Sequence, residues 1–358
     1  MSDPYRYKVP SPSDLDPARR MRNESEQIVC ILNPRAKAGE GGRLLERVKQ
    51  TMSRCFATGE VWVTEGPGHA SELAARAVAA GADLVASVGG DGTCNEVVNG
   101  LFEGDRPLDP KVVLSLIPVG TGSDLSRSLL APGTLQEAFW IAATGMTLRT
   151  DVGHLRHEEG GQVRERVFLN VAGFGANGEV VRRANASSKR LGGRATFLKA
   201  TVGALGSYEP PEVSLTWEDA AGQAGSWSGR LMSAFVANGA YCGGGMFVGR
   251  GGTLHDGLFD LTVLPPLPPH RLAAHGWRLY EGSLAKIPGV VRVQVRRLDA
   301  SVHAGAPPLL DVDGEQPGEL PVSMRCLKRV LQVRGGWLRS PLLDDSAAPA
   351  WRPGATRR

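Results

Sequence analysis

The chain has 358 residues, enough for two domains, with 42% hydrophobic and 22% charged side chains. A formal net charge of +4 and an aromatic content of 6% argue against a nucleic-acid partner, for which a clustered basic face with aromatic residues is expected. Five cysteines without a CxxC pair are typical of a reducing cytoplasm and exclude the common zinc spacings.

The first half of the chain alternates short apolar runs with helical patterns. Residues 1–26 are polar and are expected to form a flexible arm, and the alternation then runs over 27–149. Such a pattern predicts an α/β domain with a mostly parallel sheet. No stretch approaches the length of about 18 apolar residues that a membrane-spanning helix needs. We therefore expect a cytoplasmic protein that reaches any lipid from the water side.

The most informative segment, LVASVGGDGTCNEVVNG, begins at Leu84. An apolar run ends in a glycine turn with Asp91 at its centre, and a helical pattern follows. A strand, a glycine turn and a helix N-terminus together favour a bound phosphate, because free N–H groups and the helix dipole attract negative charge. The aspartate would repel bare phosphate, so it indicates a Mg²⁺-linked or proton-handling carboxylate.

Three further turns follow apolar runs in this half. Asn33 opens a second glycine-rich loop, Thr64 ends the run VWVT, and Asp124 follows the turn at 120–123. The carboxyl ends of neighbouring parallel strands share one crevice, so these turns are expected to lie together, with Asp91 and Asp124 on adjacent loops. An ordinary connection or a helix cap would explain each turn separately. His69 is interpreted as the first residue of a helix.

The second half reads as β-strands joined by glycine and proline turns. Residues 150–319 predict a β-rich, sandwich-like domain, with helices only near 179–206 and 269–286. His154 and His157 are expected to be solvated in a polar loop. Residues 341–358 are expected to be a flexible tail.

Acidic residues close one strand of this half, in the segment LLDVDGE that begins at Leu309. Asp313 and Glu315 would point to the same side if strand pairing continued, unless a turn at Gly314 alters it. An Asp-Gly turn without a catalytic role is the alternative. A second basic segment, residues 182–199, holds six cations and no acid and is a hypothetical docking site for anionic headgroups.

With these motifs in place, the chain resembles the diacylglycerol kinase catalytic-domain family, which includes bacterial soluble lipid kinases and sphingosine kinases. The resemblance runs from about Gln27 to Val333. It rests on the ordered motifs NP, T-x-x-x-G-H-A, GGDGT-x-N-E-V-x-N-G, P-x-GT-x-x-D-x-x-R, N-x-A-G-x-G, N-G-x-Y-x-GGG, DG-x-x-D and DGE. It implies a phosphofructokinase-like nucleotide domain that residues 320–340 rejoin, a β-rich lipid domain, and ATP in the cleft between them.

The resemblance also implies roles for single residues. ATP contacts fall on Asn33, Thr64, Gly89, Gly90, Asp91, Gly92, Thr93, Cys94, Asn95, Gly120, Thr121 and Asp124. The catalytic Mg²⁺ would be held by Asp91, Asp124 and Glu315, and a structural Mg²⁺ by Thr253, Asp256 and Leu258. Asp313 would accept the proton of the lipid hydroxyl, with Asp91 as the other candidate base.

Two departures from the family pattern affect these expectations. Ser123 replaces the usual Asn before Asp124, and Gly249-Arg-Gly-Gly252 replaces a Pro-x-Ala, which puts the structural metal loop in doubt. The implied activity is phosphoryl transfer from ATP to diacylglycerol or a related glycerolipid at a membrane surface. A sphingoid or ceramide kinase, an NAD kinase and a non-catalytic binding module are the alternatives, and a homodimer is compatible with each.

Overall fold

The computed structural model describes residues 23–36, 41–119, 124–128, 134–186, 200–201, 203–204, 207–249, 254–268, 271 and 274–335. The chain divides into two compact units. Unit 1 comprises the residues up to Thr150 together with those from Val330 onward, and unit 2 runs from Asp151 to Arg329. The chain enters unit 2 within strand β7 (Met146–Glu159) and returns within strand β18 (Val322–Gly335).

Unit 1 contains a parallel sheet. Its order is β2 (Phe56–Val63), β1 (Asn23–Leu32), β3 (Leu84–Gly89), β6 (Val113–Pro118) and the last residues of β18, from Gln332 to Arg334. Every residue of β3 is buried, which fits an apolar run in a sheet covered on both faces. A short β-hairpin, β4 (Phe102–Glu103) and β5 (Arg106–Pro107), follows α3.

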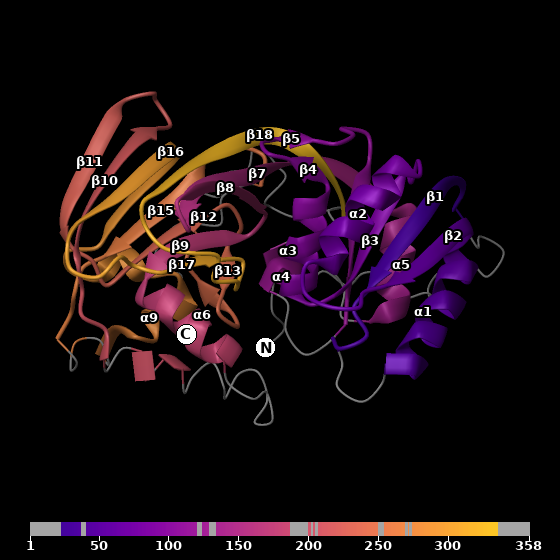
Figure 1. Ribbon diagram of the computed structural model, residues 1–358, viewed down its shortest axis with the longest axis horizontal. Coiled ribbons are helices and arrows are strands. Elements are labelled where there is room, and N and C mark those ends of the chain that lie inside the picture. Colours follow the sequence, from indigo (N-terminus) through magenta and orange to yellow (C-terminus); the bar gives the residue numbers. More distant parts are fainter. Residues whose placement is uncertain are drawn as a thin grey trace, which may run out of the picture. The chain divides into compact units, whose positions relative to one another are not determined.

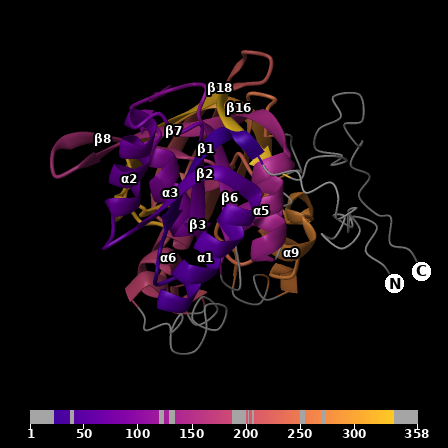
Figure 2. The same cartoon turned by 90° about the vertical axis from the view of Figure 1, so that its right-hand side faces the viewer.

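Helices cover the sheet of unit 1 on both sides. They are α1 (Gly41–Cys55), α2 (His69–Ala79), α3 (Asp91–Gly100), α4 (Asp124–Ser128) and α5 (Leu135–Thr144). Figure 2 shows α2 and α3 to one side of the strands and α5 to the other. Alternate residues of β1, namely Ile28, Cys30 and Leu32, pack with Val48 of α1 and Phe139 of α5 in one core cluster. The period of two along the strand thus gives each helical layer its own apolar face.

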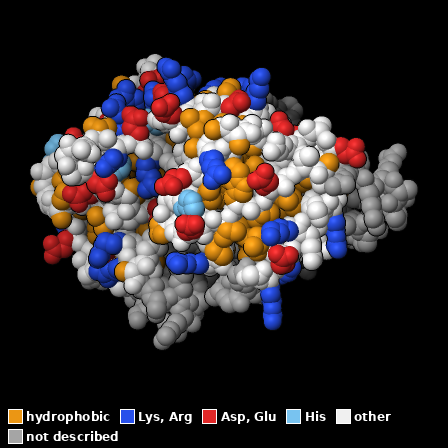
Figure 3. Space-filling model, turned by 45° about the vertical axis from the view of Figure 1, so that its right-hand side comes forward, with side chains coloured by type: hydrophobic (Ala, Val, Ile, Leu, Met, Phe, Trp, Pro, Cys, Tyr) orange, Lys and Arg blue, Asp and Glu red, His pale blue; other side chains and the backbone are white. Residues whose placement is uncertain are grey.

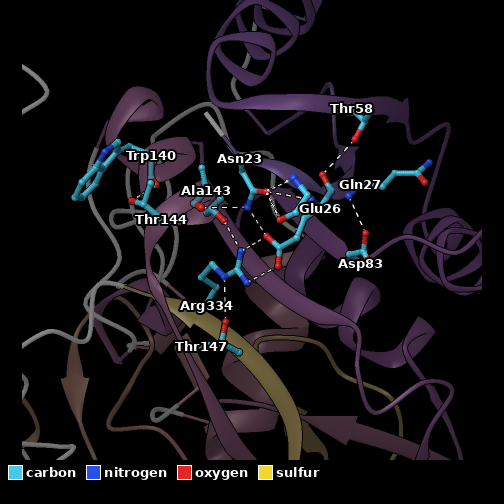
Figure 4. Close-up of polar contacts among 12 residues, drawn as sticks. Asn23, Glu26, Gln27, Thr58, Asp83, Trp140, Ala143, Thr144, Thr147 and Arg334 are labelled. Carbon is cyan, nitrogen blue, oxygen red and sulfur yellow. Dashed lines mark hydrogen bonds and ion pairs between the residues drawn. The ribbon is translucent and has the colours of Figure 1, made fainter. Parts of the chain in front are cut away.

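An ion pair ties the last strand residues of unit 1 to its first strand. Arg334 binds both carboxylate oxygens of Glu26 through its guanidinium, and it also donates to the carbonyl oxygen of Ala142 at 3.0 Å and to Thr147 Oγ1 at 3.1 Å (Figure 4). The hydrogen bond from Arg334 lowers the pKa of Glu26. One guanidinium therefore joins β1, α5, β7 and β18.

Unit 2 is built mainly of antiparallel strands. Its main order is β17 (Leu310–Val312), β9 (Val171–Gly175), β12 (Ser233–Ala237), β15 (Phe259–Leu264), β16 (Val291–Ala304) and the first part of β18. Strand β10 (Glu212–Asp219) pairs with β16 and β11 (Ala224–Arg230), and β8 (Gln162–Phe168) pairs with β7. Two short strands, β13 (Tyr241–Cys242) and β14 (Met246–Phe247), form a small hairpin. Figure 1 shows β10, β11 and β16 side by side.

The core of unit 2 lies between these strands, and few helices accompany them. Phe168 and Phe259 stack at its centre with ring centroids 5.5 Å apart. Helix α6 (Ala176–Ala186), the single turn α9 (Arg278–Glu281) and the 3₁₀ turn Leu284–Lys286 belong to this unit, and the described residues 200–201, 203–204, 207, 271 and 274–275 are also helical. The expected fold class, an α/β domain with a mostly parallel sheet plus a β-rich sandwich-like domain, is confirmed.

Two expected elements differ from the structure. Residues 167–175 read as one uninterrupted, mostly apolar run in the half expected to be β-rich, but β8 ends at Phe168 and β9 begins at Val171. The helix expected over 269–286 is interrupted: residues 271, 274 and 275 are helical, a turn at 276–277 precedes α9, and Gly282, with a φ of 70°, separates α9 from the 3₁₀ turn.

The surface mixes side-chain types. On the face shown in Figure 3, Lys and Arg side chains lie among Asp and Glu side chains, with hydrophobic side chains near the centre of the view. Among the helices of the described ranges, none has the length and apolar character to cross a bilayer.

Candidate active site

The turn between β3 and α3 places two glycines with different surroundings. A Cβ on Gly89 would lie 2.5 Å from Thr93 Oγ1, so only glycine fits where the first helical turn folds back over the strand. A Cβ on Gly90, the N-cap of α3, would meet no atom of the described residues within 4 Å. The backbone before the helix is therefore open at Gly90, and a phosphate group can approach the N–H groups of the first turn there.

Asn33 joins the first strand to this turn. Its Nδ2 donates to Thr93 Oγ1 at 3.0 Å, and its Oδ1 accepts the N–H of Arg35 at 2.9 Å. Thr64 lies on the neighbouring strand end, where its N–H donates to the carbonyl of Leu32. The expected meeting of these turns at the carboxyl edge of the sheet is confirmed, because β1 pairs with both β2 and β3.

Two residues that were expected to contact ATP, Cys94 and Asn95, have buried side chains. The side chain of Cys94 is 4% exposed and that of Asn95 is 2% exposed. Asn95 accepts hydrogen bonds from Asn99 within α3. These two side chains pack inside unit 1, and any contact they make with a phosphate would come from their backbone.

Asp91 connects the glycine turn to the segment at 124. Its Oδ2 accepts the N–H of Asp124 at 3.0 Å and its Oδ1 accepts the N–H of Leu125 at 3.3 Å, so it caps α4. The expectation that Asp91 and Asp124 lie on adjacent loops is confirmed. The carboxylate of Asp124 forms an ion pair with Arg127. Gly120 and Thr121 lie outside the described residues.

The donor set around Asp91 is compatible with Mg²⁺. Within the described parts of the chain, no three His, Cys, Asp or Glu side chains gather in the way that a protein-only metal cage requires. Mg²⁺ bound with a nucleotide typically takes one or two carboxylates, the remaining ligands being waters and phosphates. The backbone N–H of Asp124 donates to the Asp91 carboxylate, so these two neighbouring acidic residues fit the smaller requirement of one or two carboxylates.

In unit 2, the DGE motif forms a tight turn. Val312 donates to and accepts from Glu315, and the two central residues have positive φ, 50° at Asp313 and 86° at Gly314. This is the geometry of a type I′ hairpin turn, for which Asp-Gly is a preferred sequence. Strand β17 ends at Val312 and does not continue to Asp313 and Glu315, and the structure has the turn at Gly314 that the sequence left open.

The carboxylate of Asp313 is held by three backbone N–H groups. Oδ2 accepts from Leu169 at 3.0 Å, and Oδ1 accepts from Asn170 at 3.1 Å and from Val171 at 2.9 Å. These donors belong to the break between β8 and β9. The break and the DGE turn therefore fix one another, and the carboxylate keeps one orientation.

Asp311 is a neighbour whose role the sequence did not indicate. Its Oδ1 accepts the N–H of Gly314 at 3.1 Å, which supports the turn that carries Asp313. Burial, with a smaller contribution from the Asp313 charge, raises the pKa of Asp311 to about 7. Alternation of acidic residues in D-x-D was the only sequence signal for it.

The loop expected to hold a structural metal is described only in part. Asp256 Oδ1 accepts the N–H of Leu258 at 2.9 Å, while Thr253 lies outside the described residues. A buried carboxylate that the sequence patterns did not reveal, Asp151, accepts the N–H groups of Gly257 and Arg329. Burial raises the pKa of Asp151, and the hydrogen bonds from Gly257 and Arg329 partly offset this shift.

Three histidines can now be placed. His154 and His157 were expected to be solvated, which is wrong: they lie on β7 and are 2% and 3% exposed. His154 lies in a run of consecutive buried residues of β7, and both histidines are paired with β8, at Val167 and Arg164. Burial lowers the pKa of His157. His69 begins α2 as expected, and its Nδ1 accepts the N–H of Glu65.

The basic segment at 182–199 is described only at its start. Arg182 and Arg183 both form ion pairs with Glu179 on α6. These two arginines lower the pKa of Glu179 to about 2. The remaining residues of the proposed docking segment, 187–199 with their four cations, lie outside the described residues.

Comparison with known families covers most of the chain. The model of the diacylglycerol kinase catalytic domain matches residues 27–155, and that of the YegS C-terminal NAD kinase beta sandwich-like domain matches residues 170–335. A relative from Stenotrophomonas maltophilia (strain K279a), named "Probable lipid kinase YegS-like", is 30% identical over 72% of this chain and 80% of its own length. The chain belongs to the diacylglycerol kinase catalytic domain family. Membership of this family classes it as a lipid kinase.

Other relatives extend the match. A protein of Bacillus subtilis (strain 168), named "Diacylglycerol kinase", is 27% identical over 88% of this chain and 98% of its own length. A diacylglycerol kinase structure from Bacillus anthracis (strain Sterne) superposes with a TM-score of 0.62 and 22% identity, over 87% of this chain and 97% of the other. A yeast NADH kinase structure gives a TM-score of 0.50 and 11% identity, over 92% and 90%. At these identities the two structures show the family's fold alone.

Proposed function

We propose that this chain is an ATP- and Mg²⁺-dependent kinase that transfers the γ-phosphate to a hydroxyl of diacylglycerol or a related glycerolipid. The Bacillus subtilis relative named "Diacylglycerol kinase" matches over nearly its full length, which supports a glycerolipid acceptor. The observation that carries the proposal is the carboxylate of Asp313 in the DGE motif. Three backbone N–H groups hold this carboxylate, and Asp313 lies in a turn with positive φ.

Unit 1 supplies the groups for the nucleotide. In the proposed mode of binding, the phosphates lie over Gly90 and the N-terminus of α3, and Asn33 and Thr64 contact the rest of the ATP molecule. Asp91 and Asp124 would hold Mg²⁺, which would neutralise charge on the transferring phosphoryl group when bound. Thr93 keeps Asn33 in place through their hydrogen bond.

Unit 2 supplies the groups for the acceptor. The hydroxyl oxygen of the lipid forms a bond to the γ-phosphorus while the bond from that phosphorus to the β–γ bridging oxygen breaks, and ADP leaves. Asp313 accepts the hydroxyl proton. The alternative base is Asp91, which in this proposal would hold Mg²⁺, so Asp313 is preferred as the proton acceptor.

The experiment is a transfer assay with radiolabelled ATP. The purified chain is offered diacylglycerol, monoacylglycerol, sphingosine, ceramide, phosphatidylglycerol and NAD in separate reactions, and the products are resolved by chromatography. The proposal predicts label in phosphatidic acid, with loss of label when EDTA removes Mg²⁺. Label chiefly in a sphingoid phosphate or in NADP would reassign the acceptor, and ATP binding without transfer to any of them would make the chain a binding module.

A further inference from the structure

Two aromatic side chains on unit 2 are exposed three residues apart. Trp277 is 49% exposed and Tyr280 is 58% exposed, at the start of and within α9. Residues at i and i+3 share one face of a helical turn, so the two rings lie on the same side. Both rings are amphipathic, with an apolar body and one polar group, and side chains of this kind concentrate where a bilayer meets water.

The opposite side of α9 is anchored in the fold. Leu279 packs against a core cluster that includes Val248, Leu264 and Leu284. The residue after α9, Gly282, has a φ of 70°, and a Cβ there would lie 2.3 Å from the ring of Phe247. The inner side of α9 is thus packed against the core of unit 2, and this packing fixes the position of the two exposed rings.

The charges of the segment that carries the rings favour an anionic partner. Residues 265–290 contain three cations, Arg271, Arg278 and Lys286, and a single acid, Glu281. The guanidinium of Arg278 lies 4.6 Å from the centre of the Trp277 ring, which is the geometry of a cation–π contact. Each cation near an anionic membrane contributes attraction in addition to the burial of the rings.

A series of direct contacts connects the end of α9 to the proposed proton acceptor, Asp313. The Asp313 carboxylate accepts the N–H of Asn170, whose Nδ2 donates to the carbonyl of Tyr241 at 2.6 Å. The Tyr241 ring packs on Phe247 with centroids 5.1 Å apart, and Phe247 lies beneath Gly282. In Figures 1 and 2, α9 and α6 lie at the same end of unit 2. The exposed rings and the DGE turn are therefore parts of one packed region.

We propose that Trp277, Tyr280 and Arg278 form an interfacial anchor that holds unit 2 on an anionic lipid bilayer. This inference deepens the proposed function and rests on it, because it identifies the surface from which the lipid substrate is taken. The rings enter the headgroup layer, and Arg278 meets lipid phosphates beside the Trp277 ring. Unit 2 then faces the bilayer through the same packed region that carries Asp313.

The test compares a double variant with a matched control on vesicles. Trp277→Ser combined with Tyr280→Ser removes the rings, and Val163→Ser removes another exposed apolar side chain of unit 2, 56% exposed on β8. Binding to equimolar phosphatidylglycerol–phosphatidylcholine vesicles is measured by sedimentation. We expect the double variant to bind at least about tenfold more weakly, because it no longer buries two aromatic rings in the interface. Val163→Ser should bind like the unmodified chain.

A second readout separates the anchor from the kinase activity. With a short-chain diacylglycerol dissolved as monomers, the double variant should have the same turnover as the unmodified chain. With diacylglycerol carried in vesicles, the turnover of the double variant should be lost. Failure of the unmodified chain to phosphorylate the monomeric lipid would contradict the proposed function. The anchor is tested separately, because vesicle sedimentation measures binding and does not require turnover. The anchor is overturned if the double variant binds vesicles as well as the control does. It is also overturned if the rings instead join two copies, seen as a dimer that the double variant loses in light scattering.

Discussion

The carboxylate of Asp313 shows how one residue can be both structural and reactive. Three N–H groups from the β8–β9 break orient it, and its own backbone has a φ of 50°. A non-glycine residue with positive φ is uncommon and is retained where the surrounding structure fixes it. Here the surrounding structure is the pairing of β17 with β9, which places the turn over the break.

Asp311 gives the turn a dependence on pH. Its pKa is about 7 in the folded chain against an ordinary value of 3.8, so the folded state holds a proton that the unfolded state has released. The contribution of this group to stability is complete below the unfolded pKa and falls as the pH rises through the folded value. We expect the free energy of unfolding of the chain, relative to that of Asp311→Asn, to decrease from about pH 4 to about pH 7 and then level off.

Urea unfolding at a series of pH values measures this difference. The Asn side chain stays neutral and keeps an oxygen for the N–H of Gly314, so the comparison isolates the ionisation. A difference that does not change across the range would show that Asp311 ionises as it does in the unfolded chain.

At the scale of elements, the two glycines of the turn between β3 and α3 are expected to have different roles, one in folding and one in nucleotide binding. Gly89→Ala should lower the melting temperature, because its Cβ would lie 2.7 Å from the Cβ of Thr93. Gly90→Ala should leave the melting temperature unchanged, since its φ of −99° suits alanine and its Cβ would meet no described atom. If the phosphates approach at Gly90, the methyl group should raise the KM for ATP about tenfold or more. An unchanged KM would place the phosphates elsewhere.

The last strand depends on its ion pair. Arg334→Gln leaves the carboxylate of Glu26 without its guanidinium, and we expect a loss of about 1–3 kcal/mol in the free energy of unfolding near neutral pH. The pKa of Glu26 is lowered by Arg334, so the contribution is present above the ordinary value of 4.5 and disappears as the pH falls through the folded value.

Chemical denaturation at neutral and acidic pH checks both statements. Lys49→Gln serves as the control, because Lys49 forms an exposed pair with Glu46 that should contribute little. Equal effects of the two substitutions at neutral pH would contradict the role of Arg334 in holding the last strand.

Sequence patterns predicted the elements of unit 1 better than those of unit 2. Fully buried strands such as β3 are continuous apolar runs, and the glycine turns after them mark the edge where Asn33 and Asp91 meet. The break at Leu169 and Asn170 was hidden inside an apolar run, because its amides are satisfied by a carboxylate more than 140 residues away. No local pattern carries such a contact, and the burial of His154, His157 and Asp151 depends on distant strands in the same way.

At the scale of the whole molecule, the fold alone does not identify the acceptor. The yeast NADH kinase structure shares the two-part architecture at 11% identity, so the acceptor must be read from particular residues. In the proposed reaction the two units have separate roles: unit 1 binds the nucleotide, and unit 2 receives the lipid and its proton. Loss of the proton acceptor Asp313 in unit 2 should therefore affect turnover and leave ATP binding unchanged.

The most direct test is the turnover of Asp313→Asn with diacylglycerol, measured together with its dissociation constant for ATP. The control is Asp219→Asn, since Asp219 also accepts backbone N–H groups in a turn of unit 2, from Ala221 and Gln223. We expect Asp313→Asn to lower kcat by about a hundredfold or more while its ATP affinity stays close to that of the control, because the proton acceptor is lost. Its melting temperature should fall below that of the control, because the amide nitrogen cannot accept a backbone N–H that a carboxylate oxygen accepted. Near-normal turnover in Asp313→Asn would contradict the role of Asp313 as the proton acceptor.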